Sequence, residues 1–205
     1  NPFKIYTGRP VRNVDGWKLT FPKESGDIIT GYRKLGYNIF GFGGVTQFAN
    51  EYTALRKFFK PGEFIYYGPD LDEETFQTRP CEYFLLNYSS EITNRVLKSD
   101  KFFLFLNLSE THYPYDHGNE LPKDILKLAT NLKQVVNKRV NRCAMIDLIK
   151  KDKEVFSKLH RMQIESLKVV DTKLQKLVFE ILGNTQTLIL FIFSADHGDK
   201  FGEFY

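Results

Sequence analysis

Apolar residues along this chain form short runs and helical stripes that alternate with each other. Two runs, Phe102–Leu108 and Thr187–Phe193, are apolar on both faces, which is typical of strands in a parallel sheet covered by helices. Between them, apolar residues recur at helical spacing and predict a long helix from about Asp152 to Leu182, stopped by Gly183-Asn184. Strands that alternate with helices predict an α/β domain with a mainly parallel sheet flanked by helices.

The first half of the chain continues this alternation. Asn1–Gly26 contains scattered Pro, Gly and Asp and predicts a loop. Asp27–Leu35 predicts a short helix with Asp27 as its N-cap and Gly36 just after its end, and Tyr37–Phe42 predicts a strand. A weak helix, a short apolar run and an amphipathic helix are expected at Glu51–Phe59, Phe64–Tyr67 and Glu82–Lys98.

The composition is that of an ordinary globular chain. Of the 205 residues, 42% are hydrophobic, 26% are charged and 15% are aromatic, which is enough apolar surface to form a core. We expect a single α/β domain over residues 1–205 with a Lys-rich helical insertion at about 119–150. The opening Asn1-Pro2, without Met, and the end at Tyr205 just after a glycine-containing turn suggest a chain that is incomplete at both ends.

The net charge and the lengths of the apolar runs give no indication of a nucleic-acid partner or of a membrane span. A net charge of +4 is too small by itself to indicate a nucleic-acid binder. No apolar run approaches the ~18 residues that a membrane span needs, so no integral membrane segment is expected. Two cysteines, Cys81 and Cys143, are too few for a disulfide scaffold and fit either one disulfide or a reduced state. The compartment therefore stays open, with the cytoplasm slightly favoured.

Two loops hold the residues with candidate chemistry. Ser109–Tyr115 follows the first apolar run, and Ser194–Asp199 follows the second. Ligands of open α/β sheets bind just beyond the carboxyl ends of the strands, so His112, Asp196 and His197 would share one rim if both runs lie in one sheet. An adjacent carboxylate and imidazole form a reasonable half-site for a divalent metal. The simpler alternative is a capping Asp beside a surface His.

The order of these segments resembles the sulfatase family of the alkaline phosphatase superfamily. The family's final block is a long helix, a turn, an apolar strand and then Ser-Asp-His-Gly; here it is matched by Leu167–Glu203, with Ser194-Ala195-Asp196-His197-Gly198 at its centre. Three further segments resemble the family's "Thr-His-x-Pro", "Gly-Tyr-x-Thr … Gly-x-Gly" and "Thr-Gly-Arg" blocks, and they lie at Phe102–Tyr115, Ile28–Gly43 and Tyr6–Pro10.

This resemblance implies an alkaline-phosphatase-like core and a set of roles. Asp196 and His197 would be the ligands of a divalent ion, which could be Ca²⁺, Mg²⁺, Mn²⁺ or Zn²⁺. His112 would contact the oxygens of the transferred sulfate or phosphate. The family's nucleophile, a formylglycine, Ser or Thr, would lie upstream of Asn1, together with the paired aspartates that complete the metal site.

The chain also departs from the family pattern. Gly44 and Thr46 stand where the family has the Lys and His of its Lys-x-His motif, and Pro2 stands where an Arg usually follows the nucleophile. Phe204 stands where a His often follows the final Gly-Glu. These departures weaken the case for a sulfate ester, so a phosphoester or phosphodiester, in a small molecule or attached to a polymer, is nearly as well supported. A degenerate, inactive member is also compatible.

The leading hypothesis is a metal-dependent hydrolase or transferase that acts on sulfate or phosphate esters. One alternative is a non-catalytic binding or interaction protein on the same fold. Another is a binder of anionic polymers through the Lys-rich stretch Lys123–Arg161. A solvated helix face is the simpler interpretation of that stretch. Aromatic residues are not interleaved with its charges, so a nucleic-acid partner is not expected.

Overall fold

The computed structural model describes most of a small α/β unit. The described residues are 10–13, 16–19, 27–44, 48, 56–67, 85–112, 115, 122–127 and 153–195, the first two ranges as backbone only. Asp196 and His197 therefore lie outside the described residues, as does the Lys-rich insertion apart from 122–127.

A three-stranded parallel sheet forms the centre of this unit. Its strands are β3 (Asn38–Gly43), β4 (Phe64–Tyr66) and β5 (Phe102–Asn107), in the order β4-β3-β5. The last residue of β3 lies opposite the last residues of both β4 and β5, so the strands end at the same level. The parallel sheet and the strand predicted at Phe102–Leu108 are thereby confirmed.

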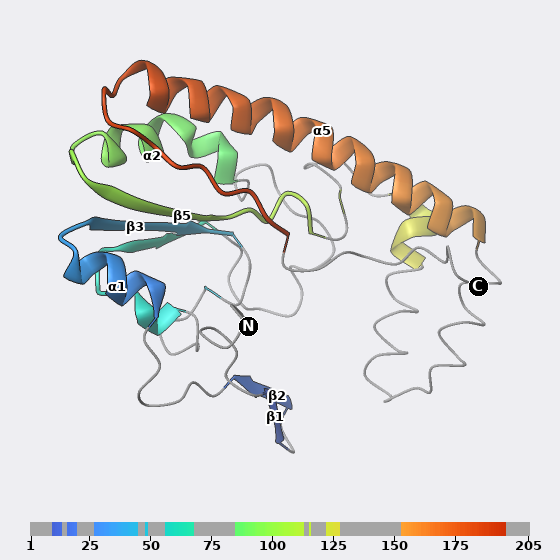
Figure 1. Ribbon diagram of the computed structural model, residues 1–205. Helices are drawn as coiled ribbons and strands as arrows, with labels where there is room; N and C mark the ends of the chain where they lie inside the picture. The colour runs from blue at the N-terminus through green and yellow to red at the C-terminus, as the bar shows by residue number, and fades with distance from the viewer. Residues whose placement is uncertain are drawn as a thin grey trace.

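Helices cover both faces of the sheet. One face carries α2 (Ser89–Val96) and the long helix α5 (Lys153–Gly183), and the other carries α1 (Ile28–Lys34) and the 3₁₀ turn η3 (Arg56–Phe58), as Figure 1 shows. The prediction of an α/β arrangement with flanking helices is confirmed at this level. The finer expectation, an alkaline-phosphatase-like core, stays a prediction.

Alternate strand residues supply the two layers of the core. In β5, Phe102, Leu104 and Leu106 pack toward α2 and α5, whereas Phe103 and Phe105 pack toward α1. This alternation follows from the two-residue period of a strand. The buried residues of the α2/α5 layer are Phe42, Leu86, Ile92, Val96, Val170, Leu177 and Ile181, and those of the α1 layer are Ile29, Ile39, Phe48, Phe59 and Phe64.

The helix α1 is capped at both ends. The Asp27 side chain accepts a hydrogen bond from the Thr30 backbone N–H at 2.7 Å, which satisfies a donor in the first turn. Gly36 has a φ of +79°, a left-handed conformation that commonly ends helices and that glycine adopts without strain. The predicted helix, its Asp27 cap and the Gly36 stop are confirmed.

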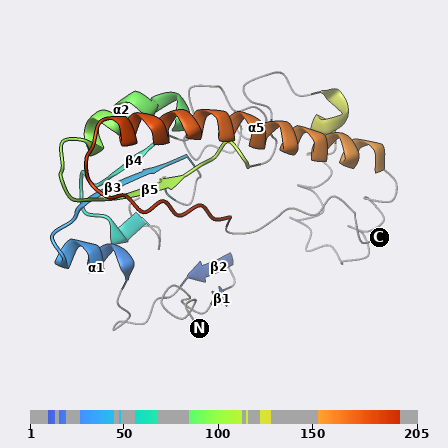
Figure 2. The ribbon, with the colours of Figure 1, turned by 45° about the horizontal axis from the view of Figure 1, so that its top comes forward.

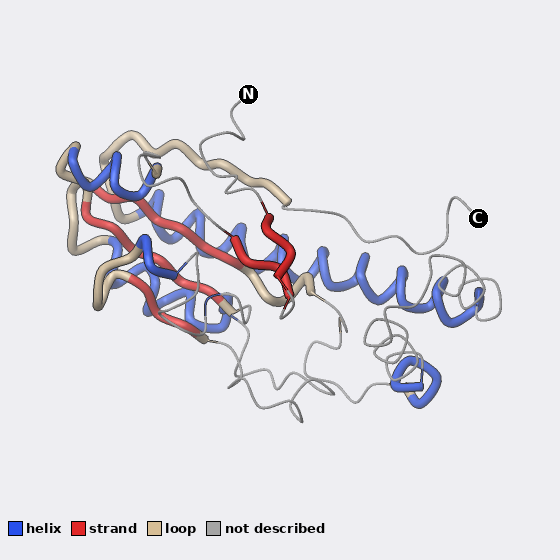
Figure 3. Tube along the Cα trace, turned by 90° about the horizontal axis from the view of Figure 1, so that it is seen from below, coloured by secondary structure: helices blue, strands red, loops and turns tan. Residues whose placement is uncertain are grey.

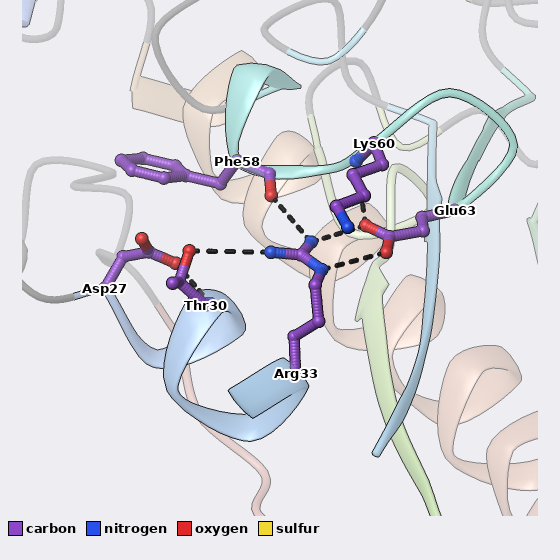
Figure 4. A network of polar contacts seen from close by, with 6 residues as sticks. All are labelled: Asp27, Thr30, Arg33, Phe58, Lys60 and Glu63. Atoms are coloured by element: carbon purple, nitrogen blue, oxygen red, sulfur yellow. Dashed lines mark hydrogen bonds and ion pairs between the residues drawn. The ribbon is translucent and has the colours of Figure 1, made fainter. Parts of the chain in front are cut away.

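An ion pair ties α1 to the start of β4 (Figure 4). The Arg33 guanidinium donates to both carboxylate oxygens of Glu63, at 3.0 and 2.5 Å, and also to the Phe58 carbonyl at 3.1 Å. Burial alone would raise the pKa of Glu63, but hydrogen bonds from Arg33 and from the Lys60 backbone N–H hold it below its usual value. We call this group the Arg33–Glu63 clamp.

The long helix α5 confirms the helix predicted between Asp152 and Leu182. Asn184 closes it, because its side-chain amide donates to the Glu180 carbonyl at 2.7 Å and its backbone N–H donates to the Ile181 carbonyl at 3.2 Å. The amphipathic helix predicted at Glu82–Lys98 is confirmed in its described part, which consists of the 3₁₀ turn η6 (Leu85–Tyr88) followed by α2; residues 82–84 lie outside the described residues.

One expectation for the N-terminal region is wrong. Within Asn1–Gly26, predicted as loop, β1 (Pro10–Asn13) and β2 (Gly16–Leu19) form an antiparallel pair. The polar, turn-forming residues between and around these strands give a loop-like pattern, which does not indicate two short segments that pair locally.

In the described part of the chain, no helix combines the length and the apolar character that a membrane crossing requires.

Candidate functional site

The carboxyl edge of the sheet is the place where the chain gathers its candidate chemistry. Beyond the strand ends, the Gly44 N–H donates to the Asn107 carbonyl at 3.1 Å, and the Tyr67 N–H donates to the Gly43 carbonyl at 2.8 Å. The three strand ends are therefore joined by hydrogen bonds into one continuous edge. In parallel sheets this edge is where loops present ligand-binding groups.

The glycines at the end of β3 serve packing. A Cβ on Gly43 would lie 2.7 Å from Phe64 Cζ, and a Cβ on Gly41 would lie 2.6 Å from Phe59 Cε1. The aromatic rings of the α1 layer thus occupy the space that larger residues would need. This close packing accounts for two glycines of the Gly41-Phe42-Gly43-Gly44 run without a phosphate.

The loop after β5 presents His112 on a firmly anchored turn. The His112 N–H donates to the Ser109 carbonyl at 3.0 Å, and its own carbonyl accepts from the Tyr115 N–H at 3.3 Å. Ser109 and Tyr115 are buried, at 1% and 3% exposure, whereas His112 is exposed. Tyr115 adopts a φ of +61°, and its hydroxyl accepts a hydrogen bond from Gln163 on α5. This arrangement leaves the His112 side chain at the surface, within reach of a ligand.

Glu110 is the main anchor of this loop. Its residue exposure is only 3%, and its Oε1 accepts a hydrogen bond from the Leu86 backbone N–H at 2.8 Å. Its backbone carbonyl accepts from the Ser166 hydroxyl on α5. The loop is thereby fixed to both η6 and α5, two residues before His112.

The Glu110 carboxyl is also electrostatically unusual. Burial raises its pKa above the ordinary value, and the hydrogen bond from Leu86 and the positive charge of Lys173 oppose that rise. Its Oε2 is buried and has no hydrogen-bond partner among the described residues. The site therefore contains a carboxyl group that holds its proton more tightly than an exposed one. Sequence reasoning missed it, because Ser109-Glu110-Thr111 has the polar composition of an exposed loop and carries no signal of burial.

The run Thr187–Phe193 does not form the fully buried strand that its composition predicts. Leu188, Leu190 and Ile192 are 98%, 79% and 77% exposed, and the segment belongs to neither sheet. Ile189 does pack against the α2/α5 layer. The physical reason is that no described strand pairs with it, because an apolar strand is fully buried only when other strands and helices lie against it.

The course of this segment nevertheless agrees with part of the expectation. Figures 1 and 2 show it leaving the end of α5 and running alongside β5 in the same direction, and Figure 3 shows the same course from below. The described end of this segment therefore lies toward the carboxyl end of β5. Asp196 and His197 follow directly in the sequence.

Of the three predicted site residues, only His112 falls within the described residues. No group of three or more His, Cys, Asp or Glu residues that could hold a metal occurs in the described part of the chain. The pairing of Asp196 and His197 on one cation is therefore a prediction. The donor types fit a divalent ion, because one offers a carboxylate oxygen and the other an imidazole nitrogen.

Residues 122–127, the described part of the Lys-rich insertion at about 119–150, are tied to α5 (Figure 1). Both Asp124 carboxylate oxygens accept hydrogen bonds from Lys158 Nζ at 2.9 Å, and the Ile125 side chain is fully buried. At this end of the region, a lysine of α5 is therefore used in an ion pair.

Comparison with family models, with curated proteins and with solved structures finds no match to this chain.

Proposed function

We propose that this chain belongs to a sulfatase-like, metal-dependent hydrolase or transferase that acts on sulfate or phosphate esters, including phosphodiesters. Asp196 and His197 hold a divalent cation at the carboxyl edge of an alkaline-phosphatase-like core, and His112 donates a hydrogen bond to the ester oxygens. The cation would neutralise the negative charge of the ester and of the transferring group.

One observation supports this proposal: two segments separated by many residues, β5 and the run after α5, lie side by side and run in the same direction toward the carboxyl edge of the parallel sheet. β5 leads into the anchored turn at Leu108–His112, and the run after α5 leads to Ser194 and Ala195. This common direction supports a shared site, because Asp196 and His197 come directly after Ala195.

The fixed position of His112 is a second support. Glu110 and Tyr115 are buried on either side of it, so the turn that carries the imidazole is held at both ends. A rigid donor is useful in catalysis because its orientation does not have to be set again when negative charge develops on the substrate.

Metal binding is the direct test. Isothermal titration with Ca²⁺, Mg²⁺, Mn²⁺ and Zn²⁺ should detect one divalent site, and Asp196→Ala or His197→Ala should weaken it by at least about 10–100-fold, the loss expected even for a supporting group of a metal site. His160→Ala and Asp171→Ala, in α5, are matched controls that should bind like the parent chain. Equal binding by all five proteins would refute the assigned ligands.

Turnover is the second test. In the protein with its full set of catalytic groups, p-nitrophenyl sulfate and bis(p-nitrophenyl) phosphate should be cleaved, and His112→Ala should lower kcat/KM while leaving metal affinity unchanged. Such a separation would assign His112 to the ester and not to the cation.

A non-catalytic binding protein on the same fold is the second candidate. Gly44 supports this candidate. It lies at the carboxyl edge of the sheet and has no side chain, whereas the sulfatase-family pattern has the lysine of its Lys-x-His motif at this position. Metal binding that depends on Asp196, without cleavage of either test ester, would favour this candidate over the enzyme.

A further inference from the structure

Glu110 places a carboxyl group in the interior of the unit, two residues before His112. The buried polar residues of the described part of the chain are Thr93, Ser109, Glu110 and Ser166, and only Glu110 among them is a carboxylic acid. The Ser166 hydroxyl on α5 donates to the Glu110 backbone carbonyl. The carboxyl group therefore lies between the loop after β5, η6 and α5, where an uncompensated charge is costly.

The two oxygens of this carboxyl group have different surroundings. Oε1 accepts a hydrogen bond from the Leu86 backbone N–H of η6 at 2.8 Å, whereas Oε2 is buried and has no hydrogen-bond partner among the described residues. Burial raises the pKa of the group, and the Leu86 N–H is the strongest influence that opposes this rise. A neutral acid needs less compensation than a carboxylate, so this environment favours the protonated form more than water does.

The charged groups around Glu110 compensate an ionised carboxylate only in part. The positive charge of Lys173 on α5 lowers the pKa of Glu110, but by less than burial raises it. Its Nζ also donates to Asn87 Oδ1 in η6 at 2.5 Å. The turn η6 contains no charged residue, and its titratable side chain, Tyr88, stacks on Tyr67 with ring centroids 4.1 Å apart. The charged or titratable side chains nearest in sequence to Ser166 and Glu110 are exposed, namely Glu165, Lys168, Asp171 and His112.

We propose that Glu110 is a pH-dependent anchor of the turn that carries His112. As the neutral acid it holds the turn against η6 and α5. As the carboxylate, with its proton released to water, it favours a detached turn in which the charge is hydrated. This inference rests on the proposed function only for the role of His112, because the attachment itself is made by Glu110, Leu86 and Ser166.

The direction of the pH effect follows from the raised pKa of Glu110. Below about pH 4.5, the ordinary value, both the attached and the detached turn carry the proton, and the attachment has its full strength. As the pH rises from there to the higher value of the attached form, only the detached turn ionises, and the attachment weakens. The site would therefore hold His112 in a fixed orientation on the acidic side and lose that order toward higher pH.

Amide hydrogen exchange at Leu86 tests the anchor directly. Glu110 Oε1 is the acceptor of this N–H, so the amide is protected as long as the turn is attached. In the parent chain its protection factor, which is corrected for the intrinsic pH dependence of exchange, should fall as the pH is raised from 4.5 and then level off. Glu110→Gln retains an acceptor but cannot ionise, so its Leu86 protection factor should be the same at every pH.

Two controls isolate the effect. Glu165→Gln makes the same change at an exposed position of α5 and should keep the pH dependence of the parent chain. The Leu97 N–H, which donates to the Thr93 carbonyl of α2 at 2.9 Å, should keep a constant protection factor in all of these proteins.

A change at Lys173 gives an independent measure that does not depend on the folding of Glu110→Gln. Lys173→Met removes a positive charge that favours the carboxylate, so the loss of Leu86 protection should extend to a higher pH than in the parent chain. Lys176→Met removes an exposed lysine from the same helix and should leave the pH range of the loss unchanged.

Three results would overturn the proposal: a Leu86 protection factor that does not depend on pH in the parent chain, a pH dependence that Glu110→Gln retains, or an unchanged pH range in Lys173→Met. None of these measurements needs a metal or an ester. Failure of Asp196 and His197 to bind a cation would thus leave the anchor in place, and a constant Leu86 protection factor would leave the proposed metal site in place.

Discussion

The two most apolar runs of this chain have similar composition but different structural environments. β5 is hydrogen-bonded to β3 along its length, and its side chains pack into both layers of the core. Thr187–Phe193 runs alongside it, pairs with no described strand and exposes Leu188 and Leu190 almost fully. Composition therefore indicates an extended backbone in both cases, whereas burial depends on which other segments lie against it.

The neighbours that bury β5 come from distant parts of the sequence. β3 pairs with one of its edges, α2 and α5 cover one of its faces, and the aromatic residues of the α1 layer cover the other. Among the described residues, the second run packs against the α2/α5 layer through Ile189. A single-sequence pattern contains no information about such non-local partners, which is why the two runs look alike before folding.

The difference between the two runs can be tested directly by making the same change, leucine to alanine, in each of them. Leu104→Ala in β5 should lower the free energy of unfolding by about 2 kcal/mol, because it removes methyl groups from the α2/α5 layer and leaves a cavity. Leu190→Ala should change it by less than about 0.5 kcal/mol, because that side chain is 79% exposed.

Urea denaturation followed by circular dichroism, at a concentration at which the chain is monomeric, measures both values. Similar losses in the two variants would mean that Leu190 is buried in solution, and the contrast between the runs would then be wrong.

The successes of sequence reasoning lie where the signal is local. Asp27 as a cap, Gly36 as a stop and the long helix that ends at Asn184 are set by residues close to one another in sequence. The α/β arrangement was also predictable, because the alternation of runs and helical stripes persists along the chain. The β1–β2 pair was missed because both strands are short and are surrounded by turn-forming residues.

The candidate site was predictable to a smaller extent. The pattern indicated the loop that carries His112, and the structure presents that residue on an exposed turn. It could not indicate that Glu110 is buried, because the groups that bury it come from η6 and α5. Asp196 and His197 lie outside the described residues, so their convergence on a metal stays a prediction.

A substitution in the Arg33–Glu63 clamp should lower the free energy of unfolding by a smaller amount, and it should affect β5 but not the second run. Glu63→Gln should cost about 1.5 kcal/mol, because it weakens charge-assisted hydrogen bonds that are mostly buried. The clamp fixes α1 to the start of β4, which belongs to the same sheet as β5, and its hydrogen bonds go to Glu63 and Phe58 and not to residues 188–193. Hydrogen exchange should therefore quicken at the β5 amides and stay unchanged at 188–193.

The pH dependence of this loss identifies its cause. The pKa of Glu63 lies below its ordinary value of 4.5, so its stabilising effect is present above that pH and is lost as the pH falls through the lower, folded-state value. The difference between the parent chain and Glu63→Gln should shrink below about pH 4.5. Asp100→Asn, an exposed carboxylate-to-amide change, is the control, and an equal loss in that variant would contradict the clamp.

The smallest expected change in stability concerns Glu110, which lies in the loop after β5 and allows the ends of the two runs to be compared. Beyond β5 the chain is anchored by this buried carboxyl, whereas Ser194 and Ala195, beyond the second run, are exposed. Burial raises the pKa of Glu110 above 4.5, so the native state binds a proton more tightly than the unfolded chain and loses stability as the pH rises through the folded-state value.

Glu110→Gln keeps an acceptor for the Leu86 N–H but carries no charge. This variant should be more stable than the parent chain by about 1 kcal/mol at neutral pH, and the two should converge below pH 4.5. Thermal unfolding across the pH range measures this convergence, and a variant that is less stable at neutral pH would show that the charged carboxylate holds the loop through a partner of its own.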